Sequence, residues 1–245
     1  MLIPSLDIIY ILAPIISLVA ALVSSLAGFG GGIVMLILLS PLIPTKELMA
    51  VICLVQFASL ISRVLIYRNH ISTRFMLEFM VGAIPATIIA SLVFDQINAA
   101  SLAVILGLFL LYSAIKPNGL PFGKLGNNTP FSGGVLSFIS FFVGAPGPGI
   151  AALLQRLEFD KFTFLGTITA CMLMQNVFKL TAFISIGVPM EKWIVICLIM
   201  SATGIIGTII GKKLGNVISE VMIFRFIRIA MLLASLNLFY KAMSI

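Results

Sequence analysis

An all-α membrane protein that crosses the bilayer several times is the fold class that this sequence predicts, from three observations. Hydrophobic residues make up 61% of the 245 residues and charged residues only 9%, whereas soluble domains carry roughly a quarter charged residues. The mean hydropathy is +1.22. Apolar runs close to the roughly 20 residues that a helix needs to span a bilayer follow one another, with short polar connections between them. We therefore expect one integral membrane domain.

Eight apolar elements are expected along the chain, in two sets of four. The expected elements are 8–43, 47–67, 75–94 and 98–115 in the first set, and 130–157, 162–187, 191–211 and 221–242 in the second. The first element of each set is longer than one span. Each is interrupted by glycine or proline, the strongest helix breakers, in "AGFGGGI" (27–33) and "VGAPGPGI" (143–150).

The two sets resemble each other weakly. Aligning the interrupted elements pairs the same residue types at four positions, which are Gly30 with Gly147, Gly32 with Gly149, Ile33 with Ile150 and, after two extra residues, Gln56 with Gln175. We therefore divide the chain into a first repeat at 1–115, a linker at 116–129 and a second repeat at 130–245.

Basic residues decide whether each interrupted element crosses the membrane or turns back. If both cross, the Lys and Arg residues outside the helix centres divide 6 against 7 between the two sides; if both turn back as re-entrant hairpins, they divide 10 against 3. The group of three is Lys46, Lys192 and Lys241, and the group of ten is Arg68, Arg74, Lys116, Lys124, Arg156, Lys161, Lys212, Lys213, Arg225 and Arg228. Because basic residues concentrate on the cytoplasmic side, the uneven division favours hairpins.

The hairpin topology has consequences for sidedness and symmetry. The loops 68–74, 116–129 and 212–220 become cytoplasmic, and both termini lie outside. Each repeat is then a broken re-entrant helical hairpin followed by three transmembrane helices. Since three is odd, the second repeat enters from the opposite face. The sequence thus predicts inverted repeats, an architecture common among secondary transporters.

The hairpin tips are the first candidates for a binding site. A new half-helix is expected near Gly31 to Ile33 and near Pro148 to Ile150, and its free N–H groups and positive dipole end favour an anion. Glycine also lets a ligand approach the backbone closely. The alternative is that small residues only allow tight helix packing, as the GxxxG spacing of Gly28 and Gly32 would.

Four polar side chains inside the expected spans are the best ligand candidates, because polar groups there usually face the protein interior or a cavity. They are Gln56, Gln175, Asn176 and Lys179. The amides can donate hydrogen bonds to the oxygens of an anion, and the lysine supplies a compensating charge. The alternatives are interhelical hydrogen bonds for the amides and snorkelling for Lys179. Arg63, near the expected cytoplasmic end of its helix, is interpreted as an orientation residue.

The cysteines and carboxylates of the chain limit which binding and coupling mechanisms we expect. Cys53 and Cys171 lie one helical turn before Gln56 and Gln175, so they are either small buried fillers or helpers in handling the substrate. No Asp or Glu lies near the centre of an expected span, which argues against a carboxylate proton relay or sodium site.

Several motifs, in this order and spacing, resemble the sulfite exporter TauE/SafE family, also called the 4-toluene sulfonate uptake permease family. They are "GFGGGI" after the first apolar run, "YRNHISTR" (67–74), "GAPGPGI", "LQRLEFDKFTFLGT" and "QNVFKL" (175–180). The resemblance covers essentially the whole chain. Many relatives carry a Gly-Pro-Pro-like tip where this chain has Gly147-Pro148-Gly149. The resemblance implies movement of sulfite, sulfonates and related oxyanions across the cell membrane.

The leading functional hypothesis is a secondary transporter for a small oxyanion in the cell (inner) membrane, working by alternating access, and the resemblance implies that the oxyanion is sulfite or an organosulfonate. The expected substrate-binding residues are Gly30, Gly31, Gly32, Ile33, Gln56, Gly147, Pro148, Gly149, Gln175, Asn176 and Lys179. An anion channel and a non-transporting assembly subunit are the alternatives. The single histidine and the lack of a catalytic constellation argue against an enzyme. No cofactor, metal or nucleic acid is expected, the lipid bilayer is the expected environment, and a homo-oligomer is compatible with the sequence.

Overall fold

The computed structural model describes residues 6–27, 30–115, 128–144, 147–214 and 220–243, and all regular structure in those ranges is helical. In chain order the α-helices are α1 (Leu6–Ala27), α2 (Gly31–Leu39), α3 (Thr45–Tyr67), α4 (Thr73–Gln96), α5 (Ala99–Ile115), α6 (Thr129–Val143), α7 (Gly147–Leu154), α8 (Lys161–Ser185), α9 (Ile194–Leu214) and α10 (Glu220–Met243). Short 3-10 helices lie at η1 (Arg68–His70), η3 (Gln155–Leu157) and η4 (Glu191–Trp193).

Five of these helices are long and apolar enough to cross a membrane, namely α1, α3, α4, α8 and α9. This confirms the predicted class of all-α membrane protein with several spans. The expected elements match the observed helices to within a few residues, and both long elements are interrupted where glycine and proline predicted.

The two interruptions depend on glycine backbone conformations. Gly30 precedes α2 with φ 101° and Gly144 ends α6 with φ 70°, values that residues with a Cβ rarely adopt. After the first break α2 turns back beside α1, since a Cβ on Gly31 would lie 2.8 Å from Ala20 O. The arms are unequal, because α1 has 22 residues and α2 has 9, while α6 has 15 and α7 has 8.

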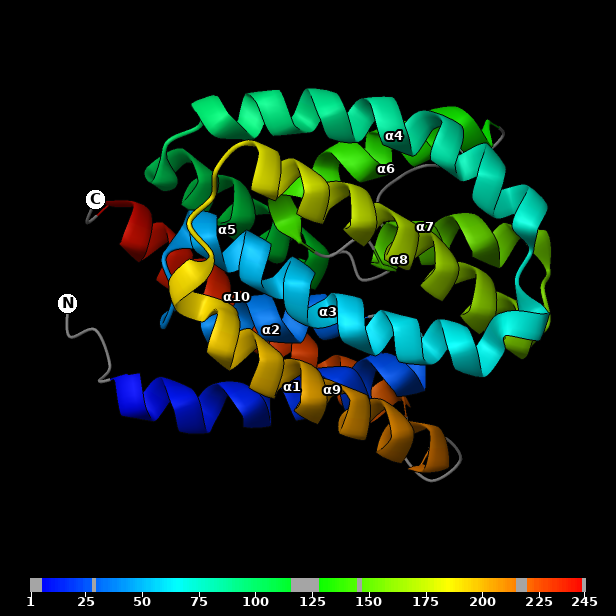
Figure 1. The fold of residues 1–245 in the computed structure, drawn as a ribbon, viewed down its shortest axis with the longest axis horizontal. Coiled ribbons are helices and arrows are strands. Elements are labelled where there is room, and N and C mark those ends of the chain that lie inside the picture. The colour runs from blue at the N-terminus through cyan, green and yellow to red at the C-terminus, as the bar shows by residue number, and fades with distance from the viewer. Residues whose placement is uncertain (1–5, 28–29, 116–127, 145–146, 215–219, 244–245) are drawn as a thin grey trace.

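The first helix of each half packs against the fourth helix of the other half. Helix α1 runs parallel to α9, where Ser17 Oγ donates to Met200 O at 2.6 Å and Ser25 Oγ donates to Thr208 O at 3.0 Å. Helix α6 packs in the same way against α4 (Figure 1). These two pairs lie on opposite sides of the bundle.

Helices α3 and α8 lie side by side between the two outer pairs (Figure 1). They are antiparallel, since Cys53 contacts Asn176 while a Cβ on Gly166 would lie 3.1 Å from Tyr67 O. The helix α2 after the first break packs against α3, and the helix α7 after the second break packs against α8. The polar side chains of α3 and α8 are therefore the ones that can reach the breaks.

The two ends of the bundle carry different loops. At one end, Lys192 pairs with Glu47 at 2.9 Å and Lys241 donates to the carbonyls of Ser40 and Ile43 at 3.1 Å. The start of α1 and the end of α10 lie at this end as well, on the left in Figure 1.

At the other end, the turn after α3 packs on the start of α8. The His70 and Phe162 ring centroids are 5.6 Å apart, and Ser72 N donates to Thr167 Oγ1 at 2.9 Å. Asp160 caps α8 there, and hydrogen bonds from Thr163 lower the pKa of its carboxyl group. The lysines Lys46, Lys192 and Lys241 are thus separated from the loop at 68–72.

Candidate functional site

The start of α2 is buried against both α1 and α3. A Cβ on Gly31 would meet Ser24 Cβ at 2.9 Å, and a Cβ on Gly32 would meet Gln56 Nε2 and Gly144 O, each at 2.7 Å. These glycines are therefore needed for packing as well as for any approach by a ligand. The first N–H groups of α2 lie beyond the intrahelical ladder, which begins with the bond from Val34 N to Gly30 O.

The end of α6, at the second break, lies close to the start of α2, at the first break. Gln56 Nε2 donates to Gly144 O at 3.4 Å, beside the start of α2. Gly147 and Gly149 at the start of α7 are buried, and Pro148 is half-buried. A Cβ on Gly149 would collide with the side chain of Leu136, so close packing explains this glycine.

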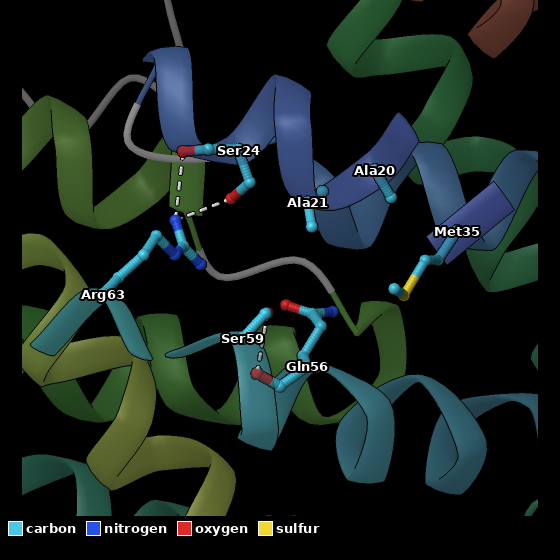
Figure 2. Close-up of a pocket in the computed structure, with 8 residues that line it drawn as sticks. Ala20, Ala21, Ser24, Met35, Gln56, Ser59 and Arg63 are labelled. Carbon is cyan, nitrogen blue, oxygen red and sulfur yellow. Dashed lines mark hydrogen bonds between the residues drawn. The ribbon is translucent and has the colours of Figure 1, made fainter. Parts of the chain in front are cut away.

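A crevice lies between the first break and α3 (Figure 2). It encloses about 180 Å³ of space between atoms but is too narrow in this conformation for a water molecule. Its lining consists of Ala20, Ala21, Ser24, Gly31, Met35, Gln56, Ser59 and Arg63. Two residues predicted from the sequence, Gly31 and Gln56, therefore share one crevice.

The structure shows that Arg63, which the sequence suggested as an orientation residue, is buried inside the bundle. Its side chain is only 2% exposed, and Nη1 donates to Ser24 O at 3.0 Å and to Ser24 Oγ at 2.7 Å. The guanidinium thus points into the crevice toward the last turn of α1, as Figure 2 shows. A signal was present in the sequence, because Arg63 follows Gln56 by seven residues, two turns along the same helix face.

Lys179 is likewise buried, with 2% of its surface exposed, so it does not snorkel. Its Nζ donates to Ser140 O at 2.7 Å, and Gly144 N donates to the same oxygen at 2.9 Å. Ser140 lies in the last turn of α6, three residues before its end, as Ser24 does in α1. Each half therefore has a buried cation bound to a carbonyl just before its break.

Two amides beside Lys179 have unused hydrogen-bonding atoms. Gln175 Nε2 donates to Ser137 Oγ, and Cys53 Sγ donates to Asn176 O at 3.4 Å and Oδ1 at 3.5 Å. Gln175 Oε1 and Asn176 Nδ2 are buried and have no hydrogen-bond partner within the part of the chain that the structure describes. An unused buried donor next to an ammonium group suits an anion.

The two cations lie at different depths in the bundle. Since Cys53 is level with Asn176, Lys179 is level with about residue 50 of α3, roughly 13 residues from Arg63. At about 1.5 Å per residue this is about 20 Å along the helix axis. A small anion cannot touch both cations at once, so the predicted residues form two neighbouring groups rather than one cluster.

Other predicted residues have different surroundings. Ile33 is 4% exposed and belongs to the larger hydrophobic core, and Gly30 is the buried residue that precedes α2. Cys171 is buried in the second core cluster. In the described ranges, no three His, Cys, Asp or Glu residues gather where they could hold a metal ion.

Comparison with known proteins agrees with this geometry. The family model described as sulfite exporter TauE/SafE matches residues 13–238, nearly the whole chain. No curated protein and no solved structure matches the chain. The match includes both helix breaks, the crevice and both buried cations, and the chain therefore belongs to the sulfite exporter TauE/SafE family.

Proposed function

We propose that the chain is a secondary transporter, not an enzyme, that moves sulfite or an organosulfonate across the cell membrane by alternating access. The family provides the general function, since it is one of membrane sulfite exporters. The residues proposed to meet the anion form two groups that it contacts in turn. The first group is Gly30 to Ile33, Gln56 and, in addition, Arg63, and the second is Gly147 to Gly149, Gln175, Asn176 and Lys179.

One observation carries this proposal. A buried guanidinium and the start of a broken helix line the same crevice, together with amide and hydroxyl groups (Figure 2). Arg63 offers planar, permanently charged donors that match an oxyanion, and helix starts attract anions through free N–H groups and the dipole. Burial strengthens both interactions because little water competes.

The narrowness of the crevice supports a transporter over an open channel. The crevice has no room for a water molecule in this conformation, so the helices around it must move before an anion can enter. The exchange of partners between halves, α1 with α9 and α6 with α4, supports inverted repeats that rock against each other.

The charges at the two ends of the bundle support the proposed orientation. Lys46, Lys192 and Lys241 gather at the end where α10 finishes, and the basic loop at 68–74 lies at the other end. By the positive-inside rule the loop end is cytoplasmic. The predictions for Gly28, for residues 116–127 and 215–219, and for the terminal residues lie outside the described residues.

Flux measurements with the purified protein test this function. Proteoliposomes that contain the protein should take up labelled sulfite at a saturable rate, and internal unlabelled sulfite should accelerate uptake by exchange. Protein-free liposomes and liposomes with the Arg63→Gln variant are the controls. Uptake that never saturates and shows no exchange would identify a channel, and uptake no faster than in protein-free liposomes would refute transport of sulfite.

A further inference from the structure

Lys179 occupies a position where free cations bind in other broken-helix transporters. The carbonyls in the last turn of a helix lie at the negative end of the dipole, and a carbonyl oxygen that already accepts one hydrogen bond keeps a second lone pair for a cation. Such half-helix ends coordinate Na⁺ in transporters with inverted repeats. In this chain the Lys179 ammonium donates to Ser140 O at 2.7 Å, in the last turn of α6, and the N–H of Gly144, which ends the helix, donates to the same oxygen at 2.9 Å.

The surroundings of Lys179 offer oxygen atoms but no carboxylate. The ion pairs of Arg74 with Glu78 and of Lys192 with Glu47 lie elsewhere. In the described part of the chain, the titratable group that faces the ammonium is the Cys53 thiol of α3. A buried charge without an ionic partner is costly, so the carbonyl end of α6 stabilises it in this structure, and an anion that binds beside it would stabilise it further.

A sodium ion cannot share this position with the ammonium. Two positive charges that compete for the same carbonyl oxygens would lie only a few ångströms apart, where their repulsion is large in a medium of low dielectric constant. No Asp or Glu lies near the centre of an expected span, so no carboxylate is placed there to bind sodium at another position.

We propose that Lys179 is a tethered cation that takes the place of a co-transported sodium ion, so that the chain neither binds nor needs sodium. The ammonium then compensates the charge of the anion and stays in the protein after release. This inference rests on the proposed transport function, and it identifies Lys179 as the group that neutralises the charge of the transported anion.

Sodium binding can be tested without transport, on purified protein. The melting temperature is measured in sodium chloride and in choline chloride at equal ionic strength, without sulfite. The wild type should melt at the same temperature in both salts. Lys179→Ala vacates the position and should gain a sodium-specific rise of about 2–4 °C, whereas Lys179→Arg, which keeps the charge, should not.

Lys241→Ala is the matched control. Lys241 also donates to carbonyls beyond a helix end, those of Ser40 and Ile43, but it is half-buried at the end of the bundle. Water can replace its ammonium there, so no sodium response is expected. A sodium-specific rise in the wild type would overturn the proposal, and so would a Lys179→Ala protein that ignores sodium. The wild-type result decides by itself if Lys179→Ala does not fold.

Flux provides a second test that separates this inference from the proposed function. Sulfite uptake into proteoliposomes should be equally fast when choline replaces sodium on both sides. Uptake that stops in choline would refute the tethered cation. A protein that moves no sulfite in either salt would count against the transport function, while the melting experiment would still decide whether sodium binds.

Discussion

Replacing Arg63 by glutamine should weaken oxyanion binding and protein stability together, for two separable reasons. The guanidinium donates to Ser24 O at 3.0 Å and to Ser24 Oγ at 2.7 Å, and it faces the crevice at the start of α2. Glutamine keeps some hydrogen bonding but has no charge and is shorter.

The expected magnitudes follow from these contacts. A hydrogen bond to a charged group is worth about 1.5–3 kcal/mol, so loss of the contact to the anion should lower affinity about tenfold to more than a hundredfold. The lost bonds to Ser24 should destabilise the protein by a similar free energy, about 1.5–3 kcal/mol. For a chain of this length that corresponds to a fall in melting temperature of roughly 3–12 °C.

The assay is calorimetric titration of purified protein with sulfite, combined with thermal unfolding. Ser25→Ala separates the two effects, because it removes the hydrogen bond from Ser25 Oγ of α1 to Thr208 O of α9 at 3.0 Å, and Ser25 does not line the crevice. It should lower the melting temperature and leave the affinity for sulfite unchanged. Arg68→Gln, at an exposed arginine just after α3, should change neither quantity.

Arg63→Lys provides a further distinction, since lysine keeps the charge but lacks the planar fork. Its affinity should lie between those of the wild type and Arg63→Gln. Wild-type affinity in a folded Arg63→Gln protein would refute the reasoning, because Arg63 would then serve only to hold α1 against α3.

Three further predictions concern other parts of the bundle. Lys179→Gln should lower sulfite affinity by about tenfold to more than a hundredfold in the same titration; equal affinity would remove Lys179 from the site. Gly31→Ala should destabilise the protein by about 1–3 kcal/mol in thermal unfolding, because its Cβ would lie 2.8 Å from Ala20 O; an unchanged melting temperature would show that α2 can shift freely. In a protein whose native cysteines are replaced, Asn69→Cys should react with an impermeant thiol reagent only from the cytoplasmic side and Ser101→Cys only from outside. Labelling of both from one side would contradict the proposed topology.

Much of the fold could be predicted from the sequence because membrane helices follow local rules. Apolar length located the spans, and glycine and proline located both interruptions, since a backbone with positive φ at Gly30 or Gly144 depends on the residue itself. The membrane class and the family resemblance also needed no coordinates, and the family model confirms the latter.

The roles of the buried cations could not be predicted in the same way. The sequence shows Arg63 near one helix end and Lys179 within another, and those positions suggested orientation for the first and left snorkelling open for the second. Which carbonyl each side chain reaches depends on how α1 and α6 pack beside α3 and α8. That packing brings together residues that are 39 positions apart in the sequence, Arg63 with Ser24 and Lys179 with Ser140.

The glycines show the same division between local and tertiary information. The sequence by itself determined that the backbone breaks near Gly31 and Gly149, because a helix propensity is a property of the local chain. Only the tertiary structure decided that Gly31 faces Ala20 O and that Gly149 makes room for Leu136. The space around a missing side chain is defined by neighbours that the fold, and not the local sequence, brings there.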